Sequence, residues 1–169
     1  GWFKRGVNPV DVMIVEPDGR AAVAPCQTHP ALTCLPTIDE VPKDFRPDVI
    51  VFAIKPQVAD QVLPTYGGFA ADRPVYLSVI AGKTTDGIRL RLGGDADVVR
   101  AMPNTPAAIG KAITALFAQP RVSGMQRQIC ERLMSAVGEV VWLAEETQMD
   151  AVTAISGSGP AYVFLFAEA

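Results

Sequence analysis

The chain has 169 residues, enough for one domain or for one domain and part of a second. Hydrophobic residues make up 49% and charged residues 20%, so a sizeable core can be buried and a disordered chain is disfavoured. The net charge is −3 and there is no basic stripe, so nucleic acid is disfavoured as a partner. The longest apolar run (161–167) is far too short to span a bilayer, and the first residues lack a signal-peptide layout, so a membrane is disfavoured as well.

Short apolar runs that end in turn residues recur along the first two thirds of the chain. They predict strands at 11–16, 48–56, 74–82 and 96–103, with 111–118 as a further candidate. The run at 48–56 is apolar without alternation, which predicts a central parallel strand covered on both faces. After the third run, Thr84 or Thr85 can cap a short helix.

From Ser123 onward the apolar spacing becomes helical. Ser123 is a candidate N-cap and Gly138 a candidate stop, after which 139–143 returns to strand. A second helix is predicted from Glu145, with three apolar residues on one face: Met149, Val152 and Ile155.

Strands that alternate with helices in this way predict an α/β fold of the doubly wound type, with an open and mostly parallel sheet. The one candidate domain boundary lies near 145–159, where the alternation gives way to helix.

The three cysteines, Cys26, Cys34 and Cys130, are irregularly spaced and form no CxxC pair. This pattern predicts reduced thiols in a cytosolic protein rather than a disulfide framework. Cys26, His29 and Cys34 could in principle ligate zinc. The second Cys–His pair that closes a tetrahedral site is missing, however, so we expect no metal site.

Ligands of doubly wound sheets bind at the carboxyl ends of the strands, which makes the residues after each predicted strand informative. Glu16 follows the first strand, where an acid of a dinucleotide domain accepts hydrogen bonds from the adenine ribose. Arg20 could instead hold a 2′-phosphate, and a solvated turn acid is the plain structural alternative. Lys55 and Pro56 could place a positive charge and backbone groups near a cofactor, or simply end a buried strand.

Residues 102–106 read MPNTP, with one proline on each side of Asn104 and Thr105. Because proline restricts its own φ and the residue before it, the loop is expected to be rigid, with an amide and a hydroxyl at its tip. Such a loop suits contact with a small polar ligand or a nicotinamide. The sequence has no nucleophile–base motif, so any chemistry here would come from a cofactor.

Residues 155–162 read ISGSGPAY, and their two spaced glycines look like the start of a nucleotide-binding loop. The dinucleotide fingerprint needs a third glycine and a preceding strand, whereas Tyr162 stands at the third position and the preceding residues are predicted to be helical. A break between two helices is the better interpretation, with Ser156 or Ser158 as a cap and Pro160 at an early helical position. Either serine could also contribute to the wall of an active site.

Five stretches, taken in chain order, resemble pyrroline-5-carboxylate reductase. They are FAIKPQ (52–57), SVIAGKT (78–84), VVRAMPNTPAAIG (98–110), SAVGEVVWLAEE (135–146) and MDAVTAISGSGPAYVFLFAEA (149–169). The resemblance implies a cytoplasmic enzyme of proline biosynthesis that transfers a hydride from NADPH or NADH to 1-pyrroline-5-carboxylate, giving L-proline. It also implies a Rossmann domain, assigned to 1–145, the start of an all-helical dimerisation domain at 146–169, and a homodimer or higher homo-oligomer.

The same resemblance implies site residues. Those expected to bind NADP or NAD are Glu16, Pro17, Ala53, Ile54, Lys55, Pro56, Ala81 and Gly82. Those expected to flank the nicotinamide and the imine are Met102, Pro103, Asn104, Thr105 and Pro106, with Ser156 and Ser158 as further wall candidates. No covalent nucleophile is needed, because a protonated imine accepts a hydride readily.

The chain departs from the family pattern at both ends. We expect the GxGxxG loop to belong before Gly1 and most of the helical domain to follow Ala169, so this stretch alone would turn over little substrate. Two other interpretations stay open. One is a catalytically inactive fragment that acts as a binding or oligomerisation module, and the other is a related NAD(P)-dependent dehydrogenase of the β-hydroxyacid type.

Overall fold

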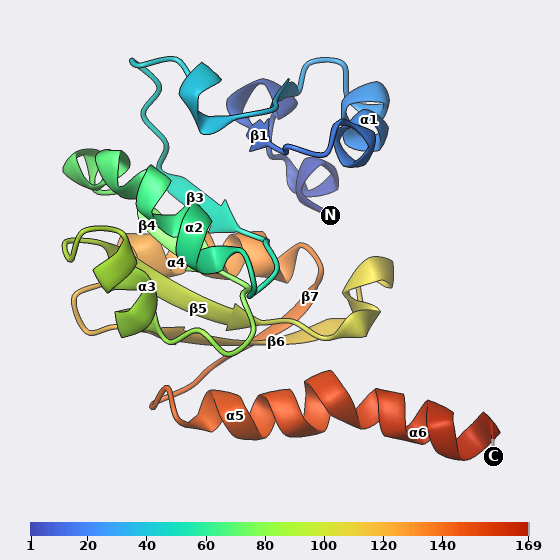
Figure 1. The fold of residues 1–169 in the computed structure, drawn as a ribbon. Helices are drawn as coiled ribbons and strands as arrows, with labels where there is room; N and C mark the ends of the chain where they lie inside the picture. The colour runs from blue at the N-terminus through green and yellow to red at the C-terminus, as the bar shows by residue number, and fades with distance from the viewer. Residues whose placement is uncertain (169) are drawn as a thin grey trace. The chain divides into compact units, whose positions relative to one another are not determined.

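The computed structural model describes residues 1–168, leaving out the side chains of residues 22 and 23. The chain divides into two compact units, Gly1–Arg46 and Pro47–Ala169 (Figure 1). Each unit has its own sheet.

The first unit is a small α/β element. Its two parallel strands, β1 (Met13–Val15) and β2 (Thr33–Leu35), are joined by helix α1 (Gly19–Thr28). Asp18 caps α1, since its carboxylate accepts a hydrogen bond from the backbone N–H of Arg20 at 3.0 Å. Short 3₁₀ turns lie at Trp2–Arg5, Pro9–Asp11 and Ile38–Glu40.

The cysteines of this unit correct the prediction of reduced thiols. Cys26 on α1 and Cys34 on β2 form a disulfide, so neither thiol is available to a metal. The sequence spacing did not indicate this pair, because the crossover from helix to parallel strand is what brings the two residues together. Cys130 is free, and burial raises the pKa of its thiol to about 12, which keeps the thiol protonated.

The second unit is built on a five-stranded sheet in the order β3-β4-β5-β6-β7. The strands are β3 (Val49–Phe52), β4 (Val75–Ser78), β5 (Asp97–Met102), β6 (Ala112–Ala118) and β7 (Gly138–Trp142). All neighbouring pairs are parallel except β5 and β6, which confirms the predicted α/β fold with a mostly parallel sheet. The segment between β5 and β6 is too short for a crossover helix, so the chain has to turn back antiparallel.

The expectation of a central strand at 48–56 is wrong for this sheet. β3 lies at one end of the order and is mostly half-buried, whereas β4 is buried along its whole length. A continuous apolar run predicts burial on both faces, but it does not identify which strands will be neighbours.

Helices cover the two faces of the sheet (Figure 1). On one face, α2 (Ala59–Val62), the 3₁₀ segment Leu63–Asp72 and α3 (Thr85–Arg91) pack over Phe52, Tyr76 and Val98. On the other, α4 (Gly124–Ser135) packs over Leu77, Val99 and Leu116. Successive strand residues such as Tyr76 and Leu77 therefore belong to different cores, as the alternation of a pleated strand requires.

Both predicted helix starts in this unit are confirmed. Thr84 caps α3 by accepting a hydrogen bond from the N–H of Gly87, and Ser123 forms a reciprocal capping box with Gln126. The predicted stop is wrong: α4 ends at Ser135, and Gly138 begins β7 instead.

The C-terminal region is one long helix rather than two helices separated by a break. Helix α5 (Gln148–Val152), a π-helical segment (Thr153–Ser158) and α6 (Gly159–Glu168) follow one another without interruption. Pro160 lacks an N–H and would clash with the carbonyl of Ser156 in a regular α-helix, and the wider π turn just before it relieves that conflict. No described helix is long and apolar enough to cross a membrane.

Gly138 is a sensitive position of this fold. Its φ is +153°, and a Cβ atom placed on it would overlap the backbone of Ala112, its partner in β6. We predict that Gly138→Ala lowers the free energy of unfolding by about 3 kcal/mol, because β6 and β7 would have to separate locally. Urea denaturation of the full-length protein measures this.

Gly124→Ala is the matched control, since a Cβ at Gly124 would meet nothing within 4 Å. That substitution should change the stability by less than about 0.5 kcal/mol. Equal effects of the two substitutions would contradict the proposed steric cause.

Candidate functional site

Most of the residues predicted to bind a ligand lie at one edge of the five-stranded sheet. Ala53–Pro56 follow β3, Ala81 and Gly82 follow β4, and Pro103–Pro106 follow β5. Because β3, β4 and β5 are parallel neighbours, their carboxyl ends share that edge (Figure 1). Glu16 and Pro17 belong to the first unit, where they follow β1.

The turn at Glu16 is held by local hydrogen bonds. The N–H of Glu16 donates to the carbonyl of Leu35 at 2.9 Å, which continues the pairing of β1 with β2. Glu16 Oε1 accepts the N–H of Asp18 at 2.9 Å, and Asp18 in turn caps α1. One carboxylate oxygen of Glu16 thus orders the turn, and the other has no hydrogen-bond partner among the described residues.

The cations near the ends of β3 and β4 differ in their surroundings. Lys83 and Arg91 both pair with Asp60, at 2.8 Å and 2.6 Å, and together they hold the pKa of the Asp60 carboxyl below its usual value. Lys55 is exposed and forms no ion pair within the described part of the chain. Its ammonium therefore remains available to an anionic ligand.

The MPNTP loop and the SGSG stretch, predicted separately, meet in the structure. Asn104 Nδ2 donates to Ser156 Oγ at 3.0 Å, and Asn104 Oδ1 accepts the backbone N–H of Ile113 at 3.0 Å. The methyl group of Met102 lies 3.0 Å from the position that a Cβ at Gly157 would occupy. The π-helical segment and the end of β5 are therefore in direct contact, while Ser158 is exposed.

A buried ion pair near this edge was missed by the sequence reasoning. The guanidinium of Arg100 on β5, with 4% of its side chain exposed, lies 3.5 Å from a carboxylate oxygen of Glu146. Glu146 also accepts the N–H of Thr85 at 2.7 Å and its hydroxyl at 2.8 Å. The available signal was an arginine with apolar neighbours on both sides in a predicted strand, because a buried charge needs a partner.

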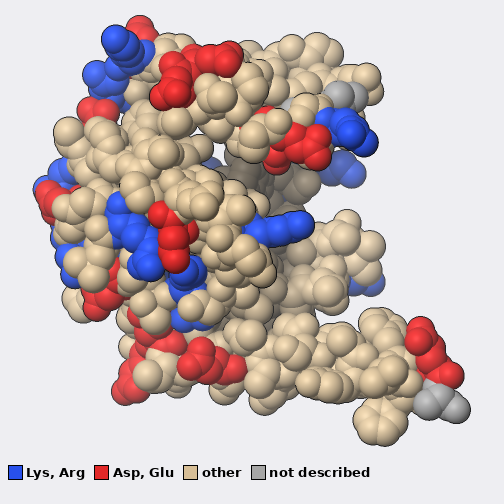
Figure 2. Space-filling model, viewed as in Figure 1, with Lys and Arg blue, Asp and Glu red and all other residues tan. Residues whose placement is uncertain are grey.

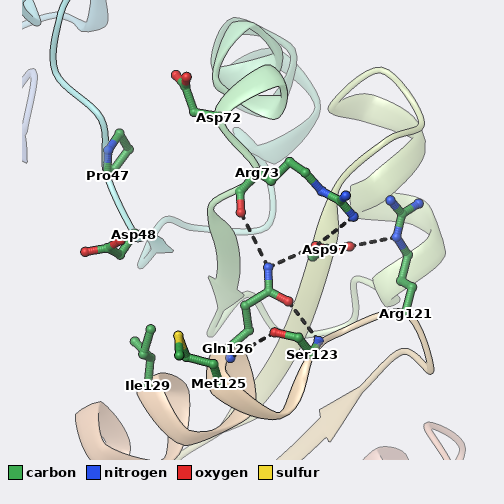
Figure 3. Close-up of a pocket in the computed structure, with 10 residues that line it drawn as sticks. All are labelled: Pro47, Asp48, Asp72, Arg73, Asp97, Arg121, Ser123, Met125, Gln126 and Ile129. Carbon is green, nitrogen blue, oxygen red and sulfur yellow. Dashed lines mark hydrogen bonds and ion pairs between the residues drawn. The ribbon is translucent and has the colours of Figure 1, made fainter.

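A polar cavity of about 390 Å³ lies at the opposite, amino ends of the strands (Figure 3). There the buried Asp97 accepts hydrogen bonds from Arg121 Nε at 2.7 Å and from Gln126 Nε2 at 2.9 Å. These groups satisfy one another, and Gln126 is also part of the cap of α4. The residues around this cavity therefore form a junction that joins β5 to α4.

No acid–base pair typical of a hydrolase is assembled in the described residues. The one histidine, His29, packs edge-on against Phe3 in the first unit, with ring centroids 4.4 Å apart. No group of three or more His, Cys, Asp or Glu side chains in residues 1–168 is arranged to hold a metal ion.

Comparison with known proteins gives matches along the whole chain. Residues 146–169 match the family described as pyrroline-5-carboxylate reductase dimerisation. The pyrroline-5-carboxylate reductase of Haemophilus influenzae is 38% identical over 125 residues (74% of this chain, 46% of that protein). That of Synechocystis is 46% identical over 123 residues (72% and 45%), and that of Pasteurella multocida is 30% identical over 171 residues (100% and 62%).

Two solved structures have a similar fold. A pyrroline carboxylate reductase of Plasmodium falciparum with NADP bound superposes with a TM-score of 0.80 at 24% identity, covering 98% of this chain and 59% of that one. A pyrroline-5-carboxylate reductase of Coxiella burnetii superposes with a TM-score of 0.72 at 29% identity, covering 95% and 68%. The chain spans about half the length of the curated relatives it matches first.

The Arg100–Glu146 pair yields a stability prediction. Glu146→Gln leaves the buried guanidinium without a countercharge, so we expect the free energy of unfolding to fall by about 3 kcal/mol. The neighbouring Glu145 is exposed, and Glu145→Gln should cost less than about 0.5 kcal/mol. Denaturant titration of both variants of the full-length protein measures the difference, and equal midpoints would count against the ion pair.

Proposed function

The chain belongs to the pyrroline-5-carboxylate reductase family, and from this premise we propose that its protein reduces 1-pyrroline-5-carboxylate to L-proline with NADPH or NADH. This is the last step of proline biosynthesis. The observation that carries the proposal is the contact between Asn104 and Ser156, which lie 52 residues apart. It joins the two most family-specific stretches, MPNTP and SGSGPAY, at the end of β5 where doubly wound folds bind their ligands.

The carboxyl edge of the sheet suits a dinucleotide. It combines three exposed residues, Ala53, Ala81 and Gly82, with the ammonium of Lys55, which has no ion pair within residues 1–168. This combination fits an anionic ligand rich in hydroxyl groups. We propose that the cofactor contacts are made there, by Ala53, Ile54, Lys55, Pro56, Ala81 and Gly82. Glu16 and Pro17 are proposed to contact the adenine ribose.

The reaction requires orientation more than covalent chemistry. When bound, the reduced nicotinamide supplies a hydride, whose electron pair forms the new C–H bond at the imine carbon while the protonated nitrogen becomes an amine. We propose that Met102–Pro106, with Ser156 and Ser158, form the wall that orients the imine and keeps water out. The prolines restrict the loop and Met102 packs on Gly157, so the wall is ordered before a ligand arrives.

We also propose that the protein works as a homodimer or higher homo-oligomer in the cytoplasm. The support is the match of 146–169 to a dimerisation family and the apolar surface of α6, where Tyr162, Phe164 and Phe166 are 63–84% exposed. The long C-terminal helix carries no charged residue from 151 to 167, and its acidic residues lie towards its two ends (Figure 2).

An assay of the full-length protein tests the proposed function. We expect oxidation of NADPH or NADH, followed by the loss of its absorbance, to depend on added 1-pyrroline-5-carboxylate and to yield proline in equal amount. Oxidation that is independent of the imine with both cofactors would refute the proposal. Light scattering of the same preparation tests the oligomer, and a monomer at assay concentration would refute that part alone.

Glu16 offers a separate test of the cofactor contacts. If its carboxylate accepts hydrogen bonds from the ribose diol, Glu16→Gln should raise the KM for NADH about tenfold and change the KM for NADPH less than about threefold, because the 2′-phosphate replaces the diol in NADPH. Glutamine keeps an amide oxygen that can accept the N–H of Asp18, so the turn stays ordered. Equal changes for the two cofactors would argue against a ribose contact.

A further inference from the structure

We propose that Asn104 is a positioning residue that fixes the direction of the Ser156 hydroxyl, so that Ser156 donates a hydrogen bond to a carboxylate or carboxamide oxygen of a bound ligand. The substrate carboxylate and the nicotinamide carboxamide both present such an oxygen. The inference rests on the proposed function and deepens it, because it gives two of the wall residues separate roles.

The orientation of the Asn104 amide follows from its surroundings. Its Oδ1 lies 3.0 Å from the backbone nitrogen of Ile113, at the start of β6. A backbone N–H only donates, so the amide oxygen has to face it. The amide NH₂ group therefore faces the other way, towards Ser156 Oγ at 3.0 Å.

The same logic extends to Ser156. An amide NH₂ group only donates, so the hydroxyl oxygen of Ser156 must be the acceptor in this contact. The hydroxyl proton takes no part in it, and no described residue accepts a hydrogen bond from Ser156. Asn104 thus holds a half-buried hydroxyl in the donor state and leaves its proton free.

The position of Ser156 makes that proton useful. Ser156 lies in the π-helical segment, which packs on Met102 at the carboxyl end of β5. π turns inside helices are frequent at functional sites, since they direct side chains that a regular helix would turn elsewhere. A neutral donor at this edge can bind a carboxylate or carboxamide oxygen of a ligand while the charge on the ligand stays unchanged.

The alternative is that the Asn104–Ser156 bond only holds the loop to the helix and has no part in ligand binding. The variant Asn104→Asp distinguishes this alternative from the proposed positioning role. One oxygen of the introduced carboxylate can still accept the N–H of Ile113, and its second oxygen can still bond to Ser156. However, a carboxylate only accepts, so Ser156 would have to donate its proton to this new side chain. Both ties survive in this variant, while the direction of the hydroxyl is reversed and one negative charge is added.

The experiment compares Asn104→Asp, Ser156→Ala and the double variant with the wild-type full-length protein. For each, thermal unfolding, NADPH binding by fluorescence, and the KM and kcat for 1-pyrroline-5-carboxylate are measured. We expect unfolding of Asn104→Asp to stay close to wild type, while one binding constant weakens about tenfold. A rise in the imine KM identifies the substrate carboxylate as the acceptor, and weaker NADPH binding identifies the carboxamide.

The double variant tests whether Asn104 acts through Ser156. We expect it to bind no more weakly than Ser156→Ala, because the hydroxyl is already gone. Asn8→Asp is the matched control for the added charge: Asn8 is an exposed cap in the first unit, and an aspartate in its place should cap Val10 as well. That control should leave both constants unchanged.

The inference would be overturned if Asn104→Asp left NADPH binding and the imine KM unchanged, or if the effects of the two substitutions were additive in the double variant. It would also be overturned if Ser156→Ala left both constants unchanged. Ser156→Ala keeps the Asn104–Ile113 bond, so it serves as the test if the aspartate variant does not fold. Each of these outcomes leaves the proposed function intact when the wild type reduces the imine. A wild type that binds no nicotinamide cofactor and reduces no imine would refute the proposed function and this inference together.

Discussion

A central constraint on the second unit is the buried guanidinium of Arg100, on the middle strand of its sheet. A buried charge is tolerated only with a partner, and Glu146 supplies it from the segment just before the C-terminal helix. The ion pair therefore holds the residues just before α5 against β5. Asn104 follows Arg100 by four residues, just past the end of β5, and Ser156 follows Glu146 by ten residues, in the π-helical segment after α5. The Arg100–Glu146 ion pair and the Asn104–Ser156 hydrogen bond therefore both join β5 and the loop after it to the C-terminal segment.

The two edges of the sheet differ in how their polar groups are satisfied. At the amino edge, Asp97, Arg121 and Gln126 bond to one another, so the buried polar groups of that cavity are paired. At the carboxyl edge, the ammonium of Lys55 and the hydroxyl proton of Ser156 have no partner in the described chain. Polar groups without a protein partner can bind a ligand without first breaking a bond within the protein, which favours the carboxyl edge for the proposed site.

What could be predicted from the sequence was mostly local. Apolar runs identified the strands except β2, and Thr84 and Ser123 marked helix starts, because these signals lie within a few residues of the structure they specify. The resemblance named the candidate wall residues only as two separate stretches, and their role stays a prediction. The position of β3 at the edge, the Cys26–Cys34 disulfide and the Arg100–Glu146 pair were not, since each depends on contacts between distant segments. The contact by which Asn104 links the two stretches could not be predicted for the same reason.

The π-helical segment shows why the predicted break at ISGSGPAY was wrong and why the serine there still matters. The glycines and Pro160 disfavour a regular α-helix, and the chain forms a wider π-helical turn here instead of ending the helix. Within that turn, Ser156 reaches Asn104 and Gly157 lies against the methyl group of Met102. Both residues lie within the irregular turn, so this turn carries the contacts that the proposed wall depends on.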